Sequence, residues 1–148
     1  MRFKKFNDIE NIRHAKVEEK PIKHYTGNID EVHCSSPSKN TSAATKKEMV
    51  EMQGMFKQRN KAIEQSVKDH DPKSEYAIEK YLKENNLEIN RNDTNKIAET
   101  GAAIARKFKN KFERARPYHL ADAMGMKFNS MPLESDSMKT PAYPSGHS

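Results

Sequence analysis

Apolar residues recur at helical spacing in three stretches of this chain, and no stretch alternates apolar and polar residues convincingly as a strand does. In the first stretch, charged residues separate apolar ones that stand mostly three or four positions apart, at Met49, Met52, Phe56, Ile63 and Val67. Thr45-Lys-Lys-Glu48 has the spacing of a capping box, so this pattern predicts one helix from Thr45 to about Asp69. Asp71-Pro72 ends it, because the residue before a proline is steered out of helical geometry.

The other two stretches predict a short helix and a long one. The short one covers about residues 73–84 and ends at Asn85-Asn86; its apolar residues are Tyr76, Ile78, Tyr81 and Leu82. The long one has the most regular stripe, formed by Ile97, Gly101, Ile104, Phe108 and Phe112. Asn92 or Asp93 is its expected cap, and Arg116-Pro117 is its expected end.

The rest of the chain is irregular in pattern. Residues 1–44 are polar and predict a partly disordered arm, with a short helix near Phe6–Lys16. Residues 118–143 predict a loop that contains one helical turn near Leu120–Met124. The predicted class is therefore all-α, with an arm (1–44) followed by a helical unit (45–148).

Composition narrows the class of protein. Of 148 residues, 34% are hydrophobic and 32% are charged, which is lean for a packed core and indicates that part of the chain is disordered or part of the fold is missing. A net charge of +6 fits nucleic acid, anionic lipid or a phosphorylated ligand, and selects none of them. The single cysteine, Cys34, excludes an internal disulfide. We find no signal peptide or membrane-spanning run, so a soluble, cytoplasmic protein is expected.

Two cations near the end of the long helix are the first candidate site residues. Lys109 and Arg116 are seven residues apart, close to two helical turns, which predicts that both lie on one face. Since this face differs from the apolar stripe, the helix can pack with one side and present charge with the other. Arginine offers a planar fork for two phosphate oxygens, and lysine offers a point charge. Taken alone, however, a basic helix face is most often solvated surface.

The last eight residues, PAYPSGHS, carry groups of a different kind. Ser145 is a hydroxyl donor, Gly146 lets the backbone approach a ligand, and His147 can lend a proton near neutral pH. Protonation is what a leaving alkoxide needs when a phosphoester is cleaved. Taken alone, the stretch would be interpreted as a turn with an exposed histidine.

Taken together, the two stretches resemble a known superfamily. Lys-x(6)-Arg-Pro and Pro-Ser-Gly-His are similar to the first two signature motifs of the type 2 phosphatidic acid phosphatases, bacterial class A acid phosphatases and vanadium haloperoxidases. Lys109, Arg116 and Pro117 match the first motif, and residues 144–147 match the second. The resemblance covers about Asp93–Ser148, and no earlier residue carries a mark of the family.

The resemblance implies a partial helical bundle of the acid phosphatase and haloperoxidase type. It implies that Lys109, Arg116, Ser145 and Gly146 bind phosphate oxygens, and that His147 is the general acid of a metal-free phosphoester hydrolysis. The nucleophile of the family is another histidine, in a third motif, Ser-Arg-x(5)-His-x(3)-Asp. No arginine of this chain is followed six positions later by a histidine. We therefore expect the front part of a catalytic domain, which does not turn over substrate alone.

Several alternatives stay open at this point. A vanadium haloperoxidase, whose cofactor is vanadate, would share every matched residue; otherwise no cofactor is expected. A basic nucleic-acid-binding protein and a phosphate-binding non-enzyme are further candidates, although a phosphorylated small molecule is the favoured partner. His119 is a candidate pocket residue, or else a helix cap or surface residue. His33-Cys34 lacks a second pair of ligands, so no metal site is predicted.

Overall fold

The computed structural model describes residues 6–71, 76–129 and 136–145, and these are mostly helical. The α-helices are α1 (Phe6–Glu10), α2 (Ala43–Phe56), α3 (Lys61–His70), α4 (Tyr76–Glu84), α5 (Arg91–Phe112) and α6 (Pro117–Ala123). Two 3₁₀ turns, η1 (Ile29–Glu31) and η2 (Asp136–Lys139), complete the described secondary structure. The predicted all-α class is confirmed as far as secondary structure goes, since the described ranges contain helices and no strand.

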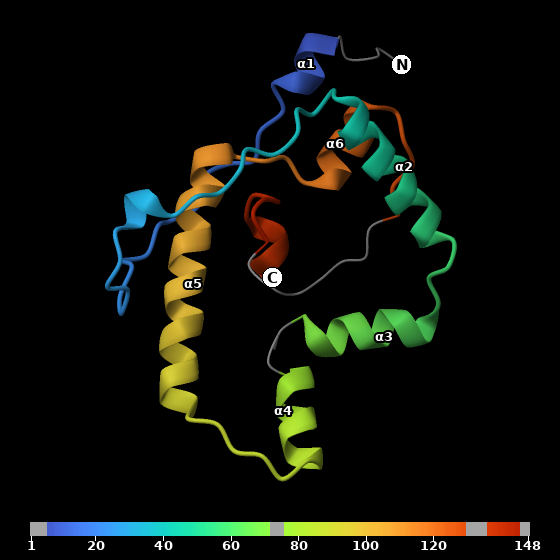
Figure 1. Ribbon diagram of the computed structural model, residues 1–148. Helices are drawn as coiled ribbons and strands as arrows, with labels where there is room; N and C mark the ends of the chain where they lie inside the picture. The colour runs from blue at the N-terminus through green and yellow to red at the C-terminus, as the bar shows by residue number, and fades with distance from the viewer. Residues whose placement is uncertain (1–5, 72–75, 130–135, 146–148) are drawn as a thin grey trace.

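The long helix α5 forms one side of the molecule (Figure 1). Helices α1, α2 and α6 gather near its C-terminal end, while α3 and α4 lie toward its N-terminal end. The C-terminal segment lies inside the frame that these helices form in this view. Within the described ranges, no helix combines the length and the apolar character needed to cross a membrane.

Helix α2 is capped three residues earlier than the sequence pattern predicts. The Ser42 side chain accepts a hydrogen bond from the backbone N–H of Thr45 (3.2 Å), which makes Ser42 the cap. The Thr45 hydroxyl donates instead to the carbonyl of Lys39, at 2.8 Å. The predicted Thr45–Glu48 capping box is therefore wrong, because Thr45 is engaged by the arm.

The single helix predicted from Thr45 to Asp69 is two helices, α2 and α3. The chain leaves α2 after Phe56, and the Asn60 side chain then caps α3 by accepting from the N–H of Ile63 at 3.0 Å. Arg59 fixes the turn between the two helices, since it donates to the carbonyl of Asn129 at 2.6 Å. Helix α3 ends at His70, as the Asp71-Pro72 signal predicts. The predicted start of the next helix, at Lys73, lies outside the described residues.

Helix α5 differs from its prediction at both ends. Asn90 is the cap, because its side chain accepts from the N–H groups of Asn92 and Asp93. The helix ends at Phe112, where Glu113 adopts a left-handed conformation (φ 48°) that stops it. Pro117 does not end α5 but begins α6, and the predicted turn near Leu120–Met124 overlaps the second half of α6. The irregular residues between Phe112 and Pro117 are called the α5–α6 joint below.

A small core lies where α2 and α6 meet the α5–α6 joint. Its fully buried members are Met49, Ala115, Leu120 and Ala121. The partly buried side chains of Ile12, Met124, Met126 and Phe128 pack around them. This core sits at the end of the molecule that also carries the candidate cations.

The N-terminal arm is attached to this end by hydrogen bonds. Asn110 of α5 accepts from the N–H of Val17 (2.8 Å) and donates to its carbonyl (2.7 Å). Within the arm, the buried Asn40 donates to the carbonyls of Ile9 (3.0 Å) and Ile12 (2.9 Å), which holds the two ends of the arm together. Of the short helix predicted near Phe6–Lys16, five residues form α1. The arm therefore covers the C-terminal part of α5.

Candidate functional site

Lys109 lies in the last turn of α5 and is buried, with only 7% of its surface exposed. Its Nζ donates to the carbonyl oxygen of Pro141, at 2.6 Å. The neighbouring Phe108 and Asn110 are buried too, because the arm and the C-terminal segment cover this end of the helix. The prediction that α5 presents Lys109 on an exposed face is therefore wrong.

Arg116 reaches the same segment from a different element. It precedes α6 in an extended conformation (ψ 148°), so it does not share a helix face with Lys109 as the seven-residue spacing predicted. Its Nε donates to the carbonyl of Thr140 at 2.7 Å, and its Nη2 bonds the Thr140 hydroxyl at 3.2 Å. Both cations therefore hold consecutive residues of one segment, which runs directly into the second motif.

A third bond fixes this segment to the joint. The N–H of Ala142 donates to the carbonyl of Arg114 at 2.9 Å. The next residue, Tyr143, packs its ring against Phe112 (5.6 Å between centroids) and donates its hydroxyl to the carbonyl of Ser35 at 2.9 Å. Residues 140–143 are thus held by α5, the joint and the arm together.

The electrostatics of the pair favour an anion. The pKa of Lys109 is lowered from 10.5 to about 8, mainly because the ammonium group is buried and also because Arg116 and Arg106 bring positive charge close to it. Burial also lowers the pKa of Arg116. A negatively charged ligand between the two groups would offset both the lost hydration and the mutual repulsion. Packing therefore leaves two cations that are partly shielded from water and that repel each other.

The remaining motif residues are placed only in part. Ser145 is exposed and follows Pro141 by four positions. Gly146 and His147 lie outside the described residues, so their predicted roles as donor and general acid stay predictions.

His119 lies in the first turn of α6, two residues after Pro117. Its ring is 4.1 Å from that of Tyr118 and 5.9 Å from that of His14, measured between centroids. Its Nδ1 is buried without a hydrogen-bond partner. Burial lowers the pKa of His119, and His14 and Arg116 add to this lowering, so the neutral imidazole is favoured. Its assignment to a pocket stays a prediction.

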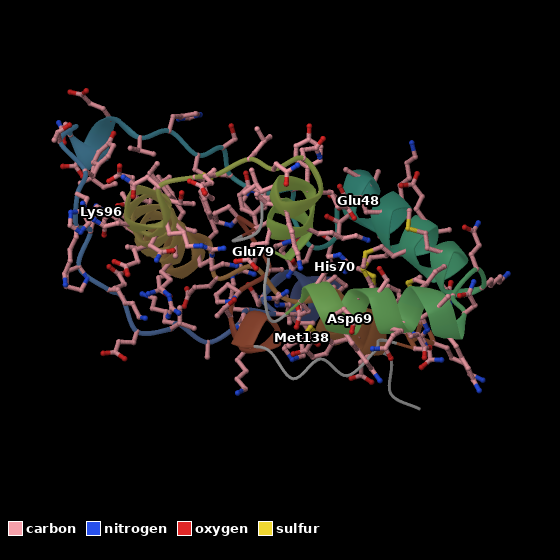
Figure 2. All side chains as sticks on the ribbon, turned by 90° about the horizontal axis from the view of Figure 1, so that it is seen from below. Glu48, Asp69, His70, Glu79, Lys96 and Met138 are labelled. Carbon is pink, nitrogen blue, oxygen red and sulfur yellow. The ribbon has the colours of Figure 1, made fainter. Side chains whose placement is uncertain are left out.

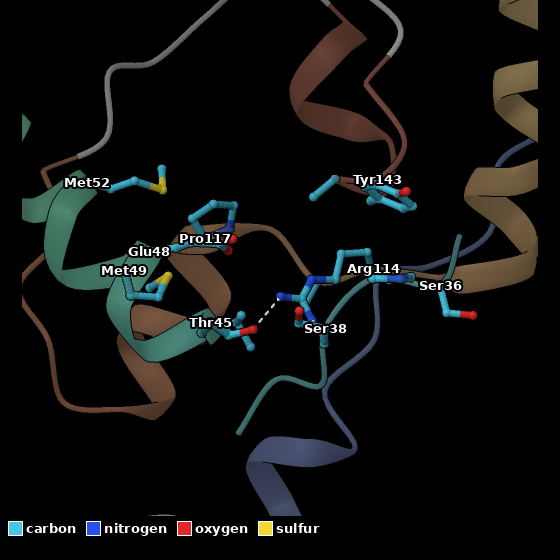
Figure 3. Close-up of a pocket in the computed structure, with 13 residues that line it drawn as sticks. Ser36, Ser38, Thr45, Glu48, Met49, Met52, Arg114, Pro117 and Tyr143 are labelled. Carbon is cyan, nitrogen blue, oxygen red and sulfur yellow. Dashed lines mark hydrogen bonds between the residues drawn. The ribbon is translucent and has the colours of Figure 1, made fainter. Parts of the chain in front are cut away.

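A cavity of about 400 Å³ lies between α2, the arm, the joint and residues 142–143 (Figure 3). Arg114 lines it and donates to the carbonyl of Ser38, to Asn40 Oδ1 (2.8 Å) and to Thr45 Oγ1 (3.0 Å). Burial lowers the pKa of Arg114, while the negative charge of Glu48 opposes that effect. Arg114 is not recognisable from the sequence, because its partners are about 70 residues away and no local pattern marks it. It joins the arm to the site.

Comparison with known proteins gives no match: no family model, no curated protein and no solved structure matches the chain. Within the described residues there is also no group of three or more His, Cys, Asp and Glu side chains that could hold a metal ion. The function is therefore inferred from the chain's own residues.

Proposed function

We propose that this chain carries the phosphate-binding part of a phosphoric ester hydrolase of the acid phosphatase and haloperoxidase type. Lys109 and Arg116 are the binding cations, Ser145 and Gly146 are further donors, and His147 is the general acid. The observation that supports this most is the attachment of both cations to Thr140 and Pro141, immediately before the second motif.

The second motif follows closely in the sequence on the residues that the two cations hold. Ser145 is four residues beyond Pro141, and four extended residues span at most about 14 Å. The segment starts from a fixed point, since Thr140 and Pro141 are bonded to the two cations and Ala142 to the joint. The second motif therefore starts three residues beyond Pro141, at a point of the chain that is bonded to both proposed phosphate-binding cations.

Each proposed group suits a phosphate monoester. An ammonium group has three donor hydrogens, so Lys109 can bond Pro141 and a phosphate oxygen together. Arg116 supplies a delocalised charge, and a hydrogen bond from a charged donor is about twice as strong as a neutral one. His147, by the resemblance, protonates the leaving oxygen. The resemblance assigns the nucleophile to a third motif that these 148 residues do not contain, so we propose that they bind phosphate without turnover.

A nucleic-acid interface fits these cations less well. Phosphate contacts to nucleic acid come from side chains that a large polyanion can reach. Lys109 is 7% exposed and bonded to Pro141, so a small anion is the better match.

Calorimetric titration with inorganic phosphate tests the proposal. The unsubstituted chain should bind phosphate, and Lys109→Met should weaken binding at least tenfold, because a hydrogen bond to a charged group contributes about 1.5–3 kcal/mol. Lys111→Met is the matched control, since Lys111 is an exposed lysine on the same turn and should leave affinity within about twofold. Circular dichroism should show that both variants retain their helices.

Two results would overturn the proposal: no phosphate binding by the unsubstituted chain, or equal losses in the two variants. Vanadate should compete for the same site, since it takes the place of phosphate in the haloperoxidase alternative. With a chromogenic ester we expect no hydrolysis by the isolated chain. Reproducible hydrolysis that disappears in His147→Ala would instead show that the chain needs no third motif.

A further inference from the structure

A second cavity, of about 340 Å³, opens between α2, α3 and the start of α6. We call it the α2–α3 cavity. Its lining includes the apolar or aromatic side chains of Phe56, Ile63, Val67, Tyr118 and Phe128, and it also includes Arg116. Small-molecule sites are typically cavities of about 300–1,000 Å³ with mostly apolar walls and a few polar groups. This cavity meets that description and borders one of the two proposed phosphate-binding cations.

Aromatic rings form a firm part of the wall. Phe56 and Phe128 pack edge to face, with 4.8 Å between centroids and an interplanar angle of 83°. This is a favoured arrangement for aromatic pairs, and it presents ring faces and edges to a guest. The ring of Tyr118, which follows the first motif directly, lies in the same lining. The wall is therefore suited to another flat ring.

The charge of the lining residues favours an anionic ligand. Arg59 and Glu64 form an ion pair at 3.0 Å, so their charges offset each other. The net positive charge among the lining residues therefore comes from Arg116. An anionic group of a bound ligand would be placed most favourably beside the Arg116 guanidinium, while the rest of the ligand would contact apolar side chains.

The α3 side of the cavity is open to solvent. Ile63 and Val67 are 45% and 39% exposed, which is unusual for residues facing an apolar wall. Met138, from the C-terminal part of the chain, lies beside α3 in the same lining (Figure 2). A guest that covers these side chains removes apolar surface from water, which is favourable.

We propose that the α2–α3 cavity binds the apolar group of an aryl phosphomonoester whose phosphate is held at Arg116 and Lys109. In such a ligand a single oxygen joins the ring to the phosphate, which matches a ring-lined wall that directly borders a cation. The small volume favours a group of one or two rings over a long chain. This assignment rests on the proposed function and adds the class of substrate.

The test compares four ligands by calorimetry: inorganic phosphate, phenyl phosphate, 1-naphthyl phosphate and dodecyl phosphate below its micelle concentration. The unsubstituted chain should bind both aryl phosphates at least tenfold more tightly than inorganic phosphate. Val67→Gln should reduce this preference at least fivefold and leave the affinity for inorganic phosphate unchanged. Because Val67 is 39% exposed, the substitution should not disturb folding. Ile97→Gln, on the exposed part of α5, is the matched control and should change neither affinity.

Each result decides between the proposals. If inorganic phosphate binds and the aryl phosphates bind no more tightly, the cavity assignment is overturned and the proposed function stands. An unchanged aryl preference in Val67→Gln also overturns the assignment. Tighter binding of dodecyl phosphate than of 1-naphthyl phosphate overturns the choice of a compact ring. If no ligand binds at all, both proposals fall.

Discussion

The two ends of α5 belong to very different surroundings. At the C-terminal end, Phe108 and Lys109 are buried beneath the arm and the C-terminal segment. At the N-terminal end, Ile97 is 73% exposed, although it continues the same apolar stripe. The neighbouring α4 shows the same exposure, at Ile78 and Tyr81. One helix therefore joins a packed region, which contains the candidate site, to a region whose apolar face is open.

This difference shows where the stability of the described fold is concentrated. Helices α3 and α4 have ten and nine residues, and isolated helices shorter than about 12–15 residues are marginal in water. The packed region adds to its helices a buried core and polar bonds between distant parts of the chain, such as those of Arg114 and Asn110. The proposed phosphate site lies in that region, where fixed side chains can be held at defined positions.

The largest expected effect is on the free energy of unfolding, when one apolar side chain is truncated in each region. Leu120 is 2% exposed and lies in the core. Leu120→Ala should lower the free energy of unfolding by about 2–5 kcal/mol, because buried apolar surface is lost and a cavity is left behind. Ile97→Ala, at the open end of α5, should change it by less than about 0.5 kcal/mol. Urea unfolding followed by circular dichroism measures both values.

Similar losses in the two variants would contradict the comparison, since they would mean that the exposed face of α5 is covered in solution. The slope of the urea transition gives a control, because it scales with the surface exposed on unfolding. It should be the same for both variants and the unsubstituted chain.

A second, smaller effect compares the helix caps of the two regions. Ser42→Ala removes the cap of α2 and Asn90→Ala that of α5, and each should cost about 0.5–2 kcal/mol. In Ser42→Ala, hydrogen exchange should become faster throughout the packed region, because α2 is part of its core. In Asn90→Ala, faster hydrogen exchange should be confined to the first turns of α5. Uniform exchange changes in both variants would show that the two regions unfold together.

The sequence predicts which segments are helical far better than it predicts where they begin. Between Met49 and Phe112, apolar residues three or four positions apart predict the segments that form α2, α3, α4 and α5. Helices have this spacing because one face is buried. The boundaries depend on which of several neighbouring polar side chains becomes the cap. Ser42, Asn60 and Asn90 are the caps observed, whereas Thr45 has the right spacing but bonds Lys39 instead. At the break before Asn60, Arg59 bonds Asn129, which is 70 residues away and which no local pattern connects with it.

The same limit applies to the candidate site. The sequence identifies Lys109 and Arg116 by type and spacing, but the reason given for their proximity, a shared helix face, is wrong. They meet because α5 stops at Glu113 and the segment around Thr140 returns to both of them. Contacts between distant residues, such as the bonds from the Arg114 side chain to Ser38, Asn40 and Thr45, leave no periodic pattern in the sequence. They follow only from the packed fold.

The smallest expected effect is a dependence of stability on pH that comes from Lys109. Its pKa in the folded chain is about 8 against an ordinary 10.5, so between these values the unfolded chain binds more protons than the folded one. Unfolding free energy should therefore rise as the pH increases from 8 to 9, by at most about 1 kcal/mol. The other shifted groups that the structure describes do not titrate in this window. The pKa values of His119 and Glu10 are lowered from 6.5 and 4.5, and that of Tyr143 is raised from 10. Arg91, Arg114 and Arg116 shift from 12.5 and keep their charge, as arginine does throughout this range. Urea unfolding at both pH values should show the rise in Lys111→Met and not in Lys109→Met. An equal rise in the unfolding free energy of the two variants would mean that another group causes the pH dependence. Lys109 would then be hydrated, as a residue of the open region would be.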